Sequence, residues 1–142
     1  MKKKTKEIFE YLGAPLKNQR TSWGSIKQDG TIFLRVWIDE RMKVGEKFHW
    51  QLTKYRCFLQ DKRNNVGWKE RLEHIELINK GAQCYLVVVN PTKDPKVLAD
   101  CADRELGLPM QDRGYKVENL YKDNEGDYWA EVSEPIEYRD MI

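Results

Sequence analysis

Tryptophan residues next to basic residues are the side chains of this sequence best suited to contact a ligand. Trp23 follows Arg20 in a polar loop, Trp37 lies two residues after Arg35, and Trp50 lies on the next expected strand. A flat aromatic ring can stack on a nucleobase while a nearby cation holds the phosphate. The pattern therefore indicates either a nucleotide contact or the ordinary packing of tryptophan in a core.

Basic residues that could contact phosphate fall mainly in two groups that bracket the expected aromatic strands. A plain charged surface explains both groups equally well, because 34% of the residues are charged while the net charge is only +2. This near balance also argues against a nonspecific nucleic-acid coat, which needs a strongly basic chain. The candidate phosphate contacts are Lys17, Arg20, Arg35, Lys54, Arg56 and Arg63.

Residues for acid–base or metal chemistry are sparse. His49 lies on the polar face of an expected strand, and His74 lies on an expected helix, four residues after Glu70. Glu70 and His74 could share a metal ion at this spacing, but the sequence indicates no third ligand. It also contains no glycine-rich phosphate loop and no GxSxG nucleophile motif. We therefore expect no enzymatic activity, no metal and no cofactor.

Length and composition predict a single domain over residues 1–142, located in the cytoplasm. A length of 142 residues is typical of one domain. Cys57, Cys84 and Cys101 have no CxxC spacing, which argues against a disulfide framework or a zinc knuckle. No apolar run approaches the roughly 20 residues of a membrane span, and none forms a signal peptide. We expect no contact with a membrane, and either a monomer or a homodimer.

Hydrophobic periodicity predicts an α+β fold with about six strands, mostly antiparallel, and two to three flanking helices. The strands form a small, strongly bent β-barrel or sheet, which begins with a three-stranded meander, and the helix within residues 1–13 packs on it. The run CYLVVVN is apolar on both faces and is expected at the centre of the sheet. The expected elements are helices over 5–12, 67–80 and 96–106, and strands over 22–26, 31–39, 48–53, 84–90, 115–120 and 128–132.

The strand over 31–39 has two different faces, because side chains two residues apart point to the same side. One face is aliphatic and is expected in the core. The other face alternates aromatic rings with charges, which we interpret as a surface for contact with a partner. The aliphatic face comprises Ile32, Leu34, Val36 and Ile38, and the second face comprises Phe33, Arg35, Trp37 and Asp39.

The order of elements over about residues 20–90, together with the short motif Ser22-Trp23-Gly24, resembles the PUA-like superfamily, which includes EVE and YTH domains. The resemblance implies a bent barrel that holds a modified or flipped nucleobase in an aromatic-lined pocket. It places Trp23 in one wall, beside Ser22. Strand alternation adds Trp37 and Trp50 as further walls. Groups that could read the base edge are Asp39, Asn18 and Gln51.

Two functions from different classes fit these patterns. One is a nucleic-acid-binding module that reads a modified or flipped base in DNA or RNA, in a microbial defence or restriction setting. The other is a protein-interaction module, an inhibitor or adaptor, that uses the face of Phe33 and Trp37, since aromatic and arginine residues dominate interface hot spots. An enzyme that uses Glu70, His74 or His49 is a third alternative.

Overall fold

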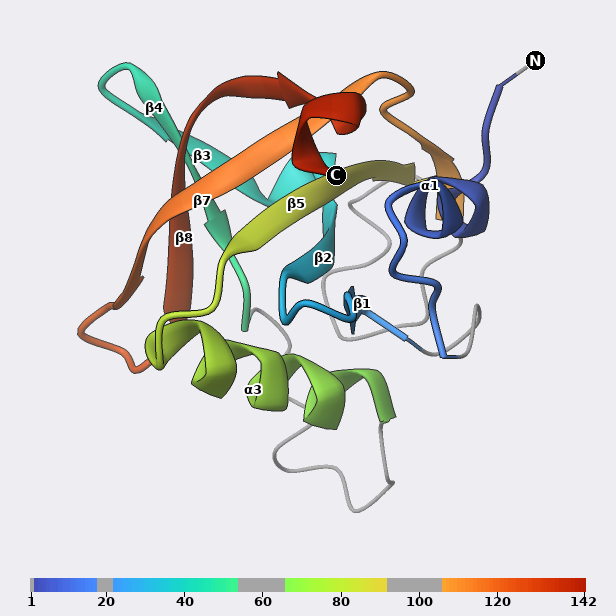
Figure 1. Ribbon diagram of the computed structural model, residues 1–142. Coiled ribbons are helices and arrows are strands. Elements are labelled where there is room, and N and C mark those ends of the chain that lie inside the picture. Colours follow the sequence, from blue (N-terminus) through green and yellow to red (C-terminus); the bar gives the residue numbers. More distant parts are fainter. Residues whose placement is uncertain (1, 18–21, 54–65, 92–105) are drawn as a thin grey trace.

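The computed structural model describes residues 2–17, 22–53, 66–91 and 106–142 (Figure 1). The described elements, in chain order, are α1 (Thr5–Tyr11), β1 (Gly24–Ile26), β2 (Ile32–Trp37), the 3-10 helix η1 (Ile38–Glu40), β3 (Arg41–Val44), β4 (Lys47–Gln51), α3 (Val66–Asn79), β5 (Cys84–Pro91), β6 (Leu106–Pro109), β7 (Arg113–Lys122), β8 (Tyr128–Glu137) and the 3-10 helix η3 (Tyr138–Met141).

The described strands form one sheet of eight strands in the order β1-β2-β5-β7-β8-β4-β3, with β6 paired to β5. The pair β2–β5 is parallel, and every other described pair is antiparallel. The predicted α+β class and mostly antiparallel sheet are confirmed. The predicted count of about six strands is too low, and the barrel is wrong, because the sheet stays open between its end strands β1 and β3.

The predicted three-stranded meander is also wrong. Strand β2 pairs with β1 and β5, whereas β4 pairs with β3 and β8. Residues 41–44 look like a charged turn in the sequence because all four side chains of β3 are exposed, which leaves no alternation of apolar and polar residues. Leu106 begins β6 rather than ending a helix. Residues 96–105 of that predicted helix lie outside the described residues.

Two hydrophobic clusters pack on opposite faces of β2 and β5. On one face, Ile32, Leu34 and Val36 pack with Trp50 of β4 and Ile75 of α3. The helices α3 and α1 lie apart in Figure 1, on different sides of the strands. The apolar run of β5 contributes to both clusters, which confirms its predicted central place. The second cluster comprises Ile8, Phe9, Leu12, Ala14, Phe33, Tyr85, Val87, Tyr138 and Met141.

The predicted contact surface on the second face of β2 is wrong, because this face is buried. Phe33 is covered by α1 and η3, and the Arg35 guanidinium lies 5.4 Å from the centre of the Trp37 ring. Phe33, Arg35 and Trp37 are 0%, 8% and 5% exposed. Of the four residues assigned to this surface, only Asp39, in η1, is exposed.

The sheet curves until strands that are not neighbours in it come into contact. The Trp50 indole N–H in β4 donates a hydrogen bond of 2.9 Å to the carbonyl of Trp37 in β2. Strands β5, β7 and β8 separate these two strands in the order of the sheet. The sheet is therefore strongly curved, although it stays open.

Arg71 of α3 bridges the same two regions of the curved sheet. Its guanidinium donates hydrogen bonds to the carbonyls of Leu52, directly after β4, of Trp23, directly before β1, and of Arg35 in β2. The three distances are 3.3, 3.1 and 2.6 Å. Arg71 is only 4% exposed. A single buried side chain thus provides polar partners for carbonyls of three separate segments.

We predict that Arg71→Met lowers the free energy of unfolding by roughly 2–4 kcal/mol, because the methionine fills the space but leaves buried carbonyls without this donor. Chemical denaturation measures the change. Lys69→Met, on the exposed side of the same helix, is the matched control and changes stability by less than about 0.5 kcal/mol. Equal stability of the two variants would contradict the bridging role.

Candidate functional site

Helix α3 holds Trp23 by its backbone from both sides. The Trp23 N–H donates to Glu70 Oε1 at 3.2 Å, and the Arg71 guanidinium donates to the Trp23 carbonyl at 3.1 Å. The Ser22 hydroxyl donates to the other oxygen of Glu70 at 3.4 Å. Two consecutive residues of one helix therefore fix the position and direction of the chain where the tryptophan leaves it.

The Trp23 side chain is half-buried, and the carbon at the centre of the Arg71 guanidinium lies 5.7 Å from the centre of its ring. A cation at this distance from an aromatic face is attracted by the ring electrons. Trp23 is thus an anchored aromatic side chain that keeps surface for a ligand.

Gly24 follows Trp23 because β1, β2 and α3 approach too closely here for a side chain. A Cβ at this position would lie 2.7 Å from the Phe33 carbonyl oxygen and 3.1 Å from His74 Nδ1. The three residues of the Ser22-Trp23-Gly24 motif therefore have separate roles. Serine bonds the helix, tryptophan keeps exposed surface, and glycine allows the helix to pack on the strand.

Two cations and a carboxylate lie near Trp23. Burial, and to a smaller extent the nearby charges of Arg71 and Lys17, together lower the pKa of His74 to about 4. Lys17 is exposed, and the segment before it is tied to β1 by a hydrogen bond from the Ser25 hydroxyl to the Pro15 carbonyl at 2.9 Å. His74 is therefore neutral near pH 7, so the charged groups beside Trp23 are the two cations and the carboxylate of Glu70.

Of the other described residues of the predicted site, Arg35 donates its backbone N–H to the Trp23 carbonyl at 2.8 Å, and neither further tryptophan has an exposed ring. Trp37 is 5% exposed and Trp50 is fully buried, so neither presents a face on which a base could stack. Asp39 is exposed in η1, and Gln51 is half-buried in β4. Arg35 is buried beside Trp37. The predicted residues Asn18, Arg20, Lys54, Arg56 and Arg63 lie outside the described residues.

Glu70 and Arg71 were missed as parts of the site by sequence reasoning. Helical spacing predicts a buried face of Trp68, Leu72, Ile75 and Ile78, but Leu72 is 39% exposed, and the side chain of Trp68 lies outside the described residues. The face that packs on the sheet contains Arg71, His74, Ile75 and Ile78. Their spacing of i, i+3, i+4 and i+7 is a signal for a buried helix face, but two of the four residues are polar.

Glu70 and His74, the predicted metal pair, have other neighbours in the fold. The carboxylate of Glu70 faces Ser22 and Trp23, whereas His74 Nδ1 faces Gly24. Among the described residues, His74 Nδ1 has no hydrogen-bond partner. No group of three metal-ligating side chains in the described ranges includes either residue.

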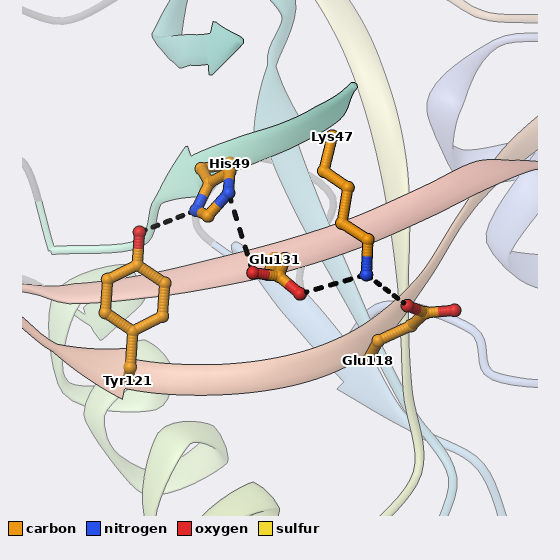
Figure 2. A network of polar contacts seen from close by, with 5 residues as sticks. All are labelled: Lys47, His49, Glu118, Tyr121 and Glu131. Carbon is orange, nitrogen blue, oxygen red and sulfur yellow. Dashed lines mark hydrogen bonds and ion pairs between the residues drawn. The ribbon is translucent and has the colours of Figure 1, made fainter. Parts of the chain in front are cut away.

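A second cluster of titratable residues lies on the outer face of β4, β7 and β8 (Figure 2). His49 Nδ1 is 2.6 Å from the Tyr121 hydroxyl, and His49 Nε2 is 3.6 Å from Glu131. Lys47 Nζ lies 3.3 Å from Glu131 and 3.4 Å from Glu118. Burial raises the pKa of Tyr121, and Glu131 and Asp123 add to this. The phenol therefore keeps its proton near pH 7.

This polar cluster contains the elements of proton transfer, namely a histidine between a phenol and a carboxylate. The carboxylates of Glu118 and Glu131 outnumber the single ammonium group of Lys47, so these three side chains together carry a net negative charge. Phosphate groups are repelled by such a surface. Its contacts join β4, β7 and β8, which is a sufficient structural reason for the arrangement.

Two further features of the described residues could attract ligands. A pocket of about 340 Å³ lies where the start of the chain meets η3, with Lys3, Arg113 and Arg139 together with Glu137 in its lining. The other is the acidic turn between β7 and β8, with Asp123, Glu125 and Asp127. Asp123 Oδ1 accepts the backbone N–H groups of both Glu125 and Asp127 at 2.9 Å. The turn thus uses its first carboxylate to hold its own backbone.

No family model matches this chain. Searches of curated proteins and of solved structures likewise find no match. Within the described ranges, no helix is both long and apolar enough to cross a membrane.

The buried His74 predicts a loss of stability in mild acid. The histidine of the unfolded chain binds a proton near its usual pKa of 6.5, whereas the folded chain binds it only near pH 4. Between these values the unfolded state binds more protons, so stability is complete above about pH 6.5 and falls as the pH approaches 4. Urea denaturation at a series of pH values measures this slope.

In the His74→Leu variant we expect this part of the slope to flatten. His49→Gln is the matched control, since it removes the other of the two histidines of the chain. A slope that is unchanged in His74→Leu would show that His74 does not titrate differently in the two states.

Proposed function

We propose that this chain binds an unpaired nucleobase of a nucleic acid by stacking it on Trp23. The observation that supports this most is that the backbone of a half-buried tryptophan is held on both sides by one helix, near two cations. Stacking on a tryptophan contributes about 1–3 kcal/mol for each base. Because hydrogen bonds already fix the backbone of Trp23, less of this energy is spent on ordering the residue when a ligand binds.

The positive charges near Trp23 would attract the phosphate backbone of the nucleic acid whose base stacks on the ring. Lys17 is exposed and close enough to His74 to lower its pKa, so it lies on the side of the molecule where β1 meets α3. A phosphate held there releases bound counterions, which makes affinity fall as salt rises. Arg71 keeps its charge but is buried, so its contribution is to the potential at the ring.

This proposal is narrower than the three-tryptophan pocket of the PUA-like resemblance. Trp37 and Trp50 lie in the core. There the indole N–H of Trp50 donates a hydrogen bond to the carbonyl of Trp37. A base in a duplex must first leave its stack, at a cost of a few kcal/mol. Single strands, or duplexes in which a modified or mismatched base leaves easily, are therefore the preferred ligands. The alternative protein-interaction surface, with Phe33 and Trp37, is buried.

Trp23→Ala is expected to weaken binding of a fluorescently labelled single strand by about 5- to 150-fold, which corresponds to the loss of one stacked base. Fluorescence anisotropy at two salt concentrations measures it, with plain and base-modified DNA and RNA as probes. Trp129→Ala is the control, because Trp129 is also half-buried but lies on β8, where its indole N–H bonds Asp123 at 2.8 Å. Equal losses in the two variants would argue against Trp23 as the stacking residue.

Lys17→Ala is expected to reduce the salt dependence of binding to a single strand. The slope of log K against log salt concentration should become less steep by about 0.7, the value for one lost phosphate contact. Lys80→Ala is the control, since Lys80 is an exposed lysine that pairs with Glu76 at the end of α3. If both variants change the slope equally, Lys17 acts through net charge alone.

A further inference from the structure

The carboxylate of Glu70 lies directly beside the proposed stacking residue. Its Oε1 accepts the backbone N–H of Trp23 at 3.2 Å, and its Oε2 accepts the hydroxyl of Ser22 at 3.4 Å. Glu70 is half-buried, so it is neither shielded from a ligand nor free to swing away from the site. These two bonds hold both oxygens next to the point where the indole leaves the backbone.

Both oxygens of Glu70 retain the capacity to accept another hydrogen bond. A carboxylate offers about four lone-pair sites and no donor. The bonds from Ser22 and Trp23 occupy one site on each oxygen. A base placed on Trp23 therefore lies close to a carboxylate whose two oxygens can each accept a further hydrogen bond.

Guanine is the nucleobase whose edge matches two adjacent acceptors. Its N1–H and its exocyclic amine are neighbouring donors on the Watson–Crick edge. Adenine and cytosine present one amine next to a ring nitrogen that accepts, and the single N3–H of thymine or uracil lies between two carbonyls. In each of these bases a carboxylate would face at least one acceptor, which repels it.

We infer that Glu70 makes the Trp23 site selective for guanine in single-stranded nucleic acid. This inference rests on the proposed function, because it names the base that the same site prefers. Arg71 and Lys17 offset the negative charge that Glu70 brings to a site for a polyanion. Glu70 thus has two roles, since the oxygens that anchor the tryptophan also read the base edge.

The test compares single strands of oligothymidine that carry one central guanine, hypoxanthine, adenine or thymine. Hypoxanthine keeps the N1–H of guanine but lacks the amine, so it removes one of the two donors without any change to the protein. We expect guanine to bind about 5- to 150-fold more tightly than adenine, the range for one good bidentate contact, and hypoxanthine to lie between them. Fluorescence anisotropy on the full chain measures the four affinities.

Glu70→Gln is expected to bring the guanine-to-adenine ratio close to one. The amide keeps one oxygen to accept the Trp23 N–H, but it replaces the second acceptor with a donor. Glu73→Gln is the matched control, because Glu73 is exposed on the same helix and its replacement removes the same charge. This control should retain the full preference. Circular dichroism checks that both variants fold. If Glu70→Gln does not fold, the comparison of guanine with hypoxanthine on the unaltered chain tests the inference.

Failure of the inference and failure of the proposed function give different results. If all four strands bind equally and Trp23→Ala abolishes that binding, guanine selectivity is overturned while stacking on Trp23 stands. If Glu73→Gln loses the preference as fully as Glu70→Gln, the effect belongs to charge and the inference is again overturned. If no strand binds the unaltered chain, the proposed function fails and the inference fails with it.

Discussion

The hydrogen bonds from the buried guanidinium of Arg71 are the interaction on which the rest of this structure depends. Moving a charged group out of water is costly, and the cost is offset only when its donors find good acceptors. Arg71 finds them in carbonyls before β1, within β2 and after β4. These segments are distant in the sequence, and β2 and β4 are not neighbours in the sheet. The arginine thereby secures the curvature of an open sheet that no strand pairing closes.

The same turn of α3 connects this structural role to the proposed site. Arg71 points inward and bonds the Trp23 carbonyl, while Glu70 bonds the Trp23 N–H. An aromatic residue at the start of an edge strand would otherwise sit on a weakly held segment, since β1 has only three residues. The two hydrogen bonds with α3 fix the backbone of Trp23 in this segment. Any ligand that stacks there is therefore coupled to the packing of α3 on the sheet.

Local patterns predicted the parts of the fold whose signal is contained in one segment. The turn at Gly30, which adopts a φ of 95°, joins β1 and β2 as expected, and β5 is buried on both faces. Alternation failed for Phe33, which is covered by segments from both ends of the chain, and for Trp37, which is also buried. It also failed for β3, whose side chains are all exposed. In each case the exposure of the side chain depends on contacts with residues far away in the sequence. The residues of the strand itself do not indicate these contacts.

The sequence by itself determined the class of fold and the central strand. These follow from hydrophobic periodicity, turn residues and the steric freedom of glycine, which are properties of neighbouring residues. Only the tertiary structure decided which tryptophan keeps exposed surface and which charged groups surround it. Burial depends on what packs against a residue from elsewhere in the chain. The curvature of the sheet placed Trp37 and Trp50 in the interior, and the packing of α3 placed Glu70 and Arg71 beside Trp23.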